Sequence, residues 1–288
     1  MRENVASVNE RLRRAVKEHG VLIASHRGSA TSGNIIENTV QAFECGLCQH
    51  ADIIETDVIR STDGKLFLFH DSESTKNEQR LLDVKATLRN LSAKEIEALR
   101  YRNQQWDSTA YRVNTLDEAL DYLKGRCLIN IDRSWDIWDS VLPVIEQHGM
   151  LDQCIVKSDP EPELLDFMER WEAPVMYMPK AFCAQDVENV RARNINTVAT
   201  EVIFFDNDAD TLDPVAQKEW KKQGILLWSN SLRLRDDWNR SAWHDDNGAI
   251  LENADAHWGW QVDHGFDILQ TDWPSMLHEY LVKHNKRF

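Results

Sequence analysis

The sequence predicts an α/β fold, a TIM (β/α)8 barrel with a small insertion after the second strand and an N-terminal helix. Three observations predict it. Eight short apolar runs alternate with stretches of helical period, which is typical of parallel strands covered on both faces. The chain has 288 residues and 42% hydrophobic content, which suits a barrel of roughly 250 residues. Polar residues follow the apolar runs, where such barrels carry their functional groups.

The elements follow from the periodicity, taken in chain order. Residues 3–18 place Val5, Val8, Leu12 and Val16 on one helical stripe, so we expect an N-terminal helix that closes the bottom of the barrel. Strands are expected at 21–26, 52–58, 126–132, 153–157, 174–178, 197–203, 225–229 and 266–270. Helices are expected at 38–50, 115–124, 136–149, 161–171, 184–194, 212–223 and 274–285.

Two segments interrupt this alternation. After the second strand, a Thr62-Asp63-Gly64 turn and the apolar run 66–69 predict a hairpin. Ser92 with Glu95 three residues later predicts a capping box at the start of a helix. We expect residues 71–113 to form the insertion over the barrel mouth and residues 231–264 to lie at the rim. Neither segment shows a core of its own, so residues 1–288 are expected to form a single domain.

The charge of the chain limits its partners. The formal net charge is −15, which opposes binding to nucleic acid or to anionic lipid. No apolar stretch reaches the length of a membrane span, and the N-terminus lacks the hydrophobic core of a signal peptide. We therefore expect a cytoplasmic protein with a small-molecule substrate, no nucleic acid and no stable membrane insertion. A signal peptide removed earlier and a homo-oligomer both stay open.

Three acidic residues predict a metal site. Glu55 and Asp57 are two apart on the second strand, so both point to the barrel interior. Two carboxylates there repel each other unless a cation lies between them. Asp132 ends the neighbouring strand and supplies a third oxygen ligand. A site of carboxylates alone favours a hard divalent cation, Mg²⁺ or Ca²⁺.

The remaining candidates predict chemistry on a phosphate ester. His26 and His70 each follow an apolar run and have charged neighbours, which favours acid–base catalysis over a purely structural role. Arg27 offers a planar fork that matches phosphate oxygens, or an ion pair with Glu37 or Asp272. Lys157 offers a further positive charge.

Three weaker candidates lie nearby. Glu37 stands at the start of the first long helix, where it can brace Arg27 or contact substrate, and Asn38 is expected to cap that helix. Trp228, near the end of the seventh strand, is a candidate for contact with an alcohol group.

Taken together, these motifs resemble the glycerophosphodiester phosphodiesterase family. The resemblance runs from residue 21 to about residue 275 and rests on an ordered set of short motifs: His26-Arg27-Gly28, Glu37-Asn38-Thr39, Glu55-x-Asp57, Asp63-Gly64, His70-Asp71, Gly265-Phe266-Asp267 and Thr271-Asp272-x-Pro274. It implies a metal-dependent phosphoric diester hydrolase that releases sn-glycerol 3-phosphate and an alcohol. It also implies that His26 and His70 are catalytic, that Arg27 binds phosphate, and that Glu55, Asp57 and an acid on the third strand bind the metal.

The sequence departs from the family at the third strand. The family reads Glu-x-Lys there, whereas this chain reads Asp132-Arg133-Ser134. Lys157, one strand away at about 4.8 Å, can restore the missing positive charge. Two alternatives to simple hydrolysis stay open: a related phosphodiesterase or lyase acting on lysophospholipid or inositol phosphodiesters, and a non-catalytic binding homologue.

Overall fold

The structure, a computed structural model, describes the chain except for residues 1, 29–34, 72–75, 234 and 236. Among the described residues, eight parallel strands close into a barrel, because β1 pairs with both β2 and β9. The strands, in their order around the barrel, are β1 (Leu22–Ser25), β2 (Ile53–Arg60), β4 (Leu128–Asp132), β5 (Cys154–Ser158), β6 (Met176–Ala181), β7 (Ala199–Val202), β8 (Leu226–Asn230) and β9 (Ile268–Thr271). All eight predicted strands are therefore confirmed, with ends that differ by up to three residues.

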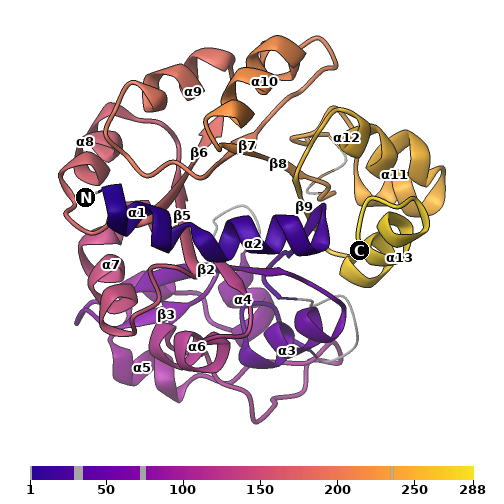
Figure 1. Cartoon of the computed structure of the whole chain (residues 1–288). Coiled ribbons are helices and arrows are strands. Elements are labelled where there is room, and N and C mark those ends of the chain that lie inside the picture. Colours follow the sequence, from indigo (N-terminus) through magenta and orange to yellow (C-terminus); the bar gives the residue numbers. More distant parts are fainter. Residues whose placement is uncertain (1, 29–34, 72–75, 234, 236) are drawn as a thin grey trace.

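Helices cover the outside of the barrel (Figure 1). They are α3 (Val40–Cys48), α6 (Leu116–Leu123), α7 (Trp138–Gln147), α8 (Pro162–Arg170), α9 (Ala184–Arg191), α10 (Pro214–Lys222) and α13 (Pro274–Lys283). These agree with the seven helices expected after the N-terminal one. Their apolar faces and the outer faces of the strands form two large buried clusters. The barrel is therefore held by burial on both sides of its sheet.

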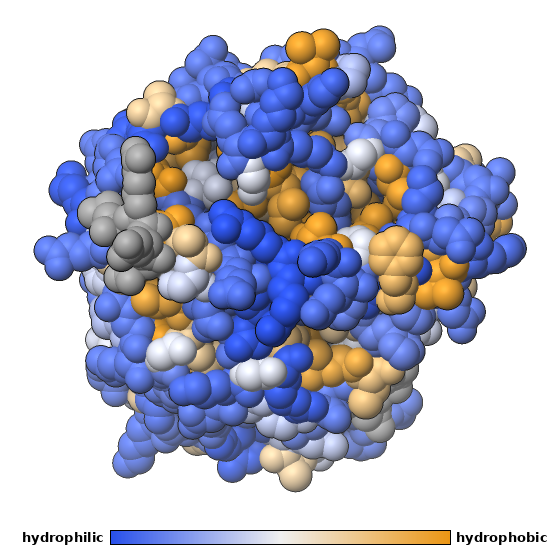
Figure 2. All heavy atoms as spheres, viewed as in Figure 1, coloured by the Kyte–Doolittle hydropathy of each residue, from blue (hydrophilic) through white to orange (hydrophobic). Residues whose placement is uncertain are grey.

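The N-terminal helix is broken, which the periodicity did not predict. It forms α1 (Arg2–Val8) and α2 (Glu10–His19), with a break at Asn9. The side-chain amides of Asn9 and Asn196 exchange two hydrogen bonds of 2.8 and 3.0 Å. Val8 and Leu12 pack against the inward-facing apolar residues of the strands, so the expected closure of the barrel bottom is confirmed. Figure 1 looks onto this end, where α1 and α2 cross the barrel, and the surface over α2 is mostly hydrophilic (Figure 2).

The insertion begins with the predicted hairpin. The short strand β3 (Leu66–Leu68) pairs antiparallel with β2, and α4 (Asn77–Leu82), the 3-10 turn η1 (Leu88–Asn90) and α5 (Ala93–Ala98) follow. The capping box of Ser92 and Glu95 is present at α5. The apolar side chains of this segment form a buried cluster together with those of β2 and β3, so the insertion packs onto the hairpin.

The segment before the last strand also differs from the prediction. Residues 231–264 were expected to lie at the rim. They also contain α11 (Asp246–Leu251), a π-helical turn η4 (Asp255–Gly259) and α12 (Trp260–Asp263). Ala249, Trp258 and Val262 join the buried cluster around β8 and β9, so these short helices complete the outer layer. In the part of the chain that the structure describes, no helix combines the length and the apolar character needed to cross a bilayer.

Candidate active site

A cavity of about 300 Å³ opens at the carboxyl ends of the strands. Side chains from six of the barrel strands and from the loops that follow β1, β3, β4 and β8 line it: His26, Arg27, Glu55, Asp57, His70, Asp132, Arg133, Trp135, Lys157, Lys180, Asn230, Leu232, Arg235, Trp238, Arg240 and Gln270. The structure thus brings together seven of the nine residues proposed from the sequence as site residues. The exceptions are Glu37 and Trp228.

The three predicted metal ligands lie side by side. Asp57 and Asp132 are paired residues on the neighbouring parallel strands β2 and β4. One carboxylate oxygen from each of Glu55, Asp57 and Asp132 lies within 4.8 Å of the other two. Hydrogen bonds hold the two carboxylates of β2 in place. The Arg27 backbone N–H donates to Glu55 Oε2 at 2.8 Å, and Asn38 Nδ2 donates to Asp57 Oδ2 at 2.9 Å.

This acidic cluster fits a divalent cation. Glu55 and Asp57 are almost completely buried. Burial, and then the neighbouring Asp57 carboxylate, raise the pKa of Glu55, which is the effect expected where like charges meet without a cation between them. The donors are all carboxylate oxygens, the set that Mg²⁺ and Ca²⁺ prefer.

Lys157 reaches the same cluster from β5. Its Nζ lies 2.9 Å from Asp132 Oδ2 and 2.8 Å from Oε2 of the buried Glu201 on β7. Burial acts to raise the pKa of Asp132, but Lys157 outweighs burial and the pKa is lowered. Lys157 therefore supplies a positive charge beside Asp132, as the sequence predicted, and makes Asp132 the most strongly neutralised of the three acids.

His26 is oriented by an acidic residue from the last strand. His26 Nδ1 lies 2.9 Å from Asp272 Oδ1. The Asp272 backbone N–H in turn donates to the buried Asp246 at 2.9 Å, and so does the Thr271 hydroxyl. Burial and Arg27 act to lower the pKa of His26, but Asp272 reverses their effect and the pKa is raised.

His70 has a different environment. Asn77 Nδ2 lies 3.3 Å from His70 Nδ1 and donates to the His70 carbonyl at 2.9 Å. Burial lowers the pKa of His70, although the Asp57 carboxylate opposes it. The two imidazoles are thus pushed in opposite directions, which is the pattern of an acid and a base that share one site.

Arg27 has a strained backbone, and its side chain pairs with two acids. Its φ is +51°, a left-handed conformation that costs a residue with a side chain about 1–2 kcal/mol. Arg27 Nη1 donates to Glu37 Oε1 at 2.7 Å, and Nε lies 3.3 Å from Asp57 Oδ2. Burial acts to raise the pKa of Glu37, but Arg27 and Arg80 lower it to about 2. Glu37 lies outside the cavity and braces Arg27, which was one of its two expected roles.

Gly28 explains how the loop after β1 approaches α3 so closely. Its φ is +70°, and a Cβ at this position would lie 2.5 Å from the carbonyl carbon of Ala42. Only glycine therefore allows Arg27 to sit against the start of α3.

Trp228 lies below the cavity instead of lining it. Its ring is fully buried among the inward-facing side chains of the barrel, and its Nε1 donates to Gln270 at 3.2 Å. Lys157 Nζ lies 5.9 Å from the centre of the ring. This position supports a packing role for Trp228 under Lys157. It does not support contact with substrate, which stays a prediction.

Several residues of the site were missed from the sequence. Asn38 was expected to cap α3, but Thr39 is the cap, and Asn38 instead uses its amide to hold Asp57 and Thr56. Lys180 follows the apolar run of β6 and carried the same signal as Lys157, a charge at the end of a strand. Arg240 lies in the irregular loop after β8, and Asp246 begins the short helix α11. Spacing in the sequence gives no signal for either residue.

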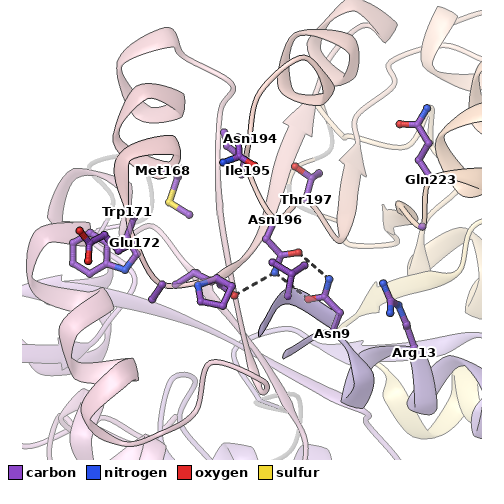
Figure 3. A pocket seen from close by; sticks show the side chains of 15 residues that line it. Asn9, Arg13, Met168, Trp171, Glu172, Asn194, Ile195, Asn196, Thr197 and Gln223 are labelled. Carbon is purple, nitrogen blue, oxygen red and sulfur yellow. Dashed lines mark hydrogen bonds between the residues drawn. The ribbon is translucent and has the colours of Figure 1, made fainter. Parts of the chain in front are cut away.

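A second cavity lies at the opposite end of the barrel (Figure 3). It also measures about 300 Å³, and the paired side chains of Asn9 and Asn196 face each other within it. Its lining includes none of the site residues proposed from the sequence. Seven of the proposed site residues line the cavity at the carboxyl ends of the strands, so that cavity is the candidate active site.

Sequence comparison supports this assignment. Residues 26–153 match the model of the Glycerophosphoryl diester phosphodiesterase family. Over these residues, the chain is similar to the glycerophosphodiester phosphodiesterase family. Residues 173–281 match a second model, described as a domain of unknown function. Both matched segments contribute strands to the same closed sheet.

Two relatives carry the same family name. A glycerophosphodiester phosphodiesterase of Bacillus altitudinis is 30% identical over 145 residues, which cover 47% of this chain and 57% of the relative. One of Bacillus subtilis (strain 168) is 32% identical over 108 residues, which cover 35% of this chain and 36% of the relative. The chain thus spans 57% and 36% of the length of these two phosphodiesterases.

Solved structures share the fold over almost the whole chain. A glycerophosphoryl diester phosphodiesterase from Parabacteroides distasonis has a TM-score of 0.75 at 17% identity and covers 98% of this chain and 92% of its own. A phosphodiesterase from Oleispira antarctica, solved with its product sn-glycerol-3-phosphate, has a TM-score of 0.66 at 16% identity and covers 91% of this chain and 97% of its own. At these identities the likeness shows the barrel alone.

Proposed function

We propose that this chain is a metal-dependent phosphodiester hydrolase that acts on glycerophosphodiesters and releases glycerol 3-phosphate and an alcohol. One observation carries the proposal: a cluster of three carboxylates shares a cavity with Arg27 and with two imidazoles whose pKa values are shifted apart. The names of the relatives, and the product held by the Oleispira antarctica enzyme, support the same substrate class.

The proposed roles follow from the contacts. Arg27 and Lys157 bind the phosphate oxygens and Glu37 fixes the Arg27 fork, while Trp228 supports Lys157 from below. His70 has the lowered pKa and no acidic partner among its described hydrogen bonds, so it takes a proton from the attacking water. His26, paired with Asp272, gives a proton to the leaving alkoxide as its P–O bond breaks.

The proposed metal ligands are Glu55, Asp57 and Asp132. Mg²⁺ or Ca²⁺ bound there would neutralise negative charge that develops on the phosphate oxygens. We further propose that residues 1–288 form one domain, with the insertion at about 71–113, and that its partner is a small diester; a cytoplasmic location and a homo-oligomer stay predictions.

The function is tested with purified protein and diesters of glycerol 3-phosphate, assayed with Mg²⁺, with Ca²⁺ and with EDTA. We expect release of glycerol 3-phosphate that depends on the metal, and a loss of about 10²–10⁴-fold in kcat for His26→Ala and for His70→Ala. His284→Ala on the outer end of α13 is the matched control, and it should behave as the wild type.

The possible failures are distinct. Detection of a cyclic phosphate by phosphorus NMR would show that the same site catalyses an intramolecular transfer instead of hydrolysis. If no diester is cleaved with either metal, and the histidine variants change nothing, the hydrolase proposal is wrong and a binding homologue takes its place.

A further inference from the structure

The cavity carries a second group of cations besides Arg27 and Lys157. Around the barrel the strands run β1-β2-β4-β5-β6-β7-β8-β9, so β6 lies four strands from β1 in either direction. Lys180 is the residue before the last in β6 and is 7% exposed. Its Nζ lies 3.0 Å from Asp159 Oδ1 and 4.3 Å from the centre of the Trp135 ring. The Asp159 side chain is 43% exposed, so water screens this ion pair.

Arg133 approaches the same tryptophan from the end of β4. Its guanidinium lies 6.0 Å from the Trp135 ring, and its Nη2 is 3.5 Å from Asp71, an acid that also pairs with Arg89. The Nε of Arg133 is buried and makes no hydrogen bond within the described part of the chain. Its φ of +48° is left-handed, like that of Arg27, and strain of this kind is typical of functional positions.

Arg240 completes the group from the loop after β8. Its guanidinium lies 5.2 Å from the Trp238 ring, and its Nη1 is 3.2 Å from Glu201. Glu201 already pairs with Lys157, and Arg240 Nε is buried without a hydrogen bond in the described structure. Each of the three cations thus has an acidic partner that is shared or reached by water: Asp71 is shared with Arg89, Glu201 is shared with Lys157, and Asp159 is half-exposed.

The phosphodiester does not account for these cations. Its phosphate is placed against Arg27, Lys157 and the carboxylate cluster, and a diester phosphate carries a single charge. The formal net charge of the chain is −15, so a group of cations at one place is a local feature. Lys180 and Arg240 also lie outside residues 26–153, in the part matched by the domain of unknown function.

We propose that Lys180, Arg133 and Arg240, backed by Trp135 and Trp238, form a subsite for a second anionic group carried by the alcohol half of the substrate. The inference rests on the proposed function, since it assumes that the phosphate of a phosphodiester is bound at Arg27 and the carboxylate cluster. It assigns the substrate class as glycerophosphodiesters whose alcohol bears a carboxylate or a phosphate. The cations would pair with that group, and the two indole rings hold them in place.

The test uses one series of diesters that differ only in charge. Glycerol 3-phosphate is esterified with ethanolamine, ethylene glycol, glycolate or 2-hydroxyethyl phosphate, so the alcohol carries an ammonium, no charge, a carboxylate or a phosphate. We expect kcat/KM to be at least about ten-fold higher for the better anionic diester than for the neutral one, and lowest for the ammonium. The carboxylate and phosphate members show which anion fits better.

Variants locate the preference. Lys180→Gln and Arg240→Gln should each reduce the ratio of kcat/KM between anionic and neutral diesters about ten-fold, whereas Lys218→Gln, exposed on α10, should leave that ratio as in the wild type. Equal rates for all four diesters, or a ratio unchanged in both pocket variants, would overturn the subsite while leaving the hydrolase intact. If none is cleaved, calorimetric binding of the same four diesters decides: tighter binding of the anionic members supports the subsite, and equal binding rejects it.

Discussion

Asp272 determines how the two imidazoles differ. His26 and His70 line one cavity and both are largely buried, and burial alone lowers the pKa of an imidazole. Only His26 has a carboxylate at 2.9 Å from its Nδ1. The pKa of His26 therefore rises while that of His70 falls, and both catalytic forms coexist in a window that includes pH 6.5, the ordinary imidazole value.

The first prediction concerns Asp272→Asn. At pH values below the pKa of His70 the base is protonated, and at pH values above the raised pKa of His26 the acid has lost its proton. The rate should therefore fall on both sides of this pH window. Without the Asp272 charge the pKa of His26 drops, so the alkaline limb of the kcat/KM profile should move to lower pH and the rate at pH 8 should fall by about ten-fold or more. The pH–rate profile measures this. Asp263→Asn, an exposed acid paired with Lys286, is the control, and an alkaline limb that stays in place would contradict the assignment of His26.

The second prediction concerns Glu55 and the metal. Because burial and Asp57 raise the pKa of Glu55, the folded protein binds a proton more tightly than the unfolded chain does. Without metal, stability should therefore fall as the pH rises from the ordinary carboxyl range towards that raised pKa. A divalent cation at 100 times its Kd should add about 2.7 kcal/mol, with a larger gain at pH 8 than at pH 6.

Thermal melts with EDTA, Mg²⁺ and Ca²⁺ at the two pH values test it. Glu55→Gln should remove both the dependence on pH and most of the stabilisation by metal. Asp132→Asn should weaken the metal effect less, since Lys157 already neutralises Asp132. Equal stabilisation of wild type and Glu55→Gln would place the cation elsewhere.

At the level of the elements, α6 resumes the regular alternation after the insertion. Thr115 caps it by accepting from the Glu118 backbone N–H, and the Glu118 carboxylate accepts from the Thr115 N–H at 3.0 Å. Arg112 and Asn114 also donate to Glu118. This reciprocal cap fixes where the chain returns from the insertion to the barrel.

The third prediction is that Thr115→Ala lowers the free energy of unfolding by about 1 kcal/mol, a fall in Tm of about 2–4 °C. Thr115→Ser keeps the capping oxygen and should recover most of the loss. The two variants are compared in urea unfolding and in thermal melts. Equal losses in both would assign the effect to packing of the threonine methyl group.

Features that depend on residues close together in the chain could be predicted from the sequence, whereas features that depend on distant residues could not. The strands and most helices follow from local apolar periods, and Glu55 and Asp57 share a face because side chains alternate along a strand. The break at Asn9 could not be predicted, because its amide partner, Asn196, lies 187 residues away. Arg240 was missed for the same reason, since only the fold brings its irregular loop to Glu201 on β7.

On the scale of the whole molecule, the acidic surface and the basic cavity are complementary. The net charge of the chain is −15, whereas the structure gathers Arg27, Arg133, Lys157, Lys180 and Arg240 around one cavity. An anionic substrate is repelled by most of the surface and attracted to one opening, which favours productive encounters.

The barrel is also closed by a contact far from this cavity. Arg287, near the end of the chain, forms a forked ion pair with Asp52 through distances of 2.6 and 2.9 Å, and it donates to the carbonyls of Val21 and His50 at 3.1 Å. Asp52 also accepts from the backbone N–H of Ile23 at 2.8 Å. Arg287 and Asp52 are both largely buried, and together they hold the last segment against the loops that enter β1 and β2.

The fourth prediction follows from that burial. Arg287→Ala takes the guanidinium from Asp52 and leaves that carboxylate with His19, whose Nδ1 lies 2.6 Å away. Removal of one member of a buried ion pair costs about 3–5 kcal/mol, so the midpoint of urea unfolding should fall markedly. Arg287→Lys should recover only part of the loss, because an ammonium cannot bond both oxygens as the guanidinium fork does. The double variant Arg287→Met with Asp52→Asn removes both charges and should be more stable than Arg287→Ala. If it is instead equally unstable, the forked pair acts by positioning the chain end and not by compensating a buried charge.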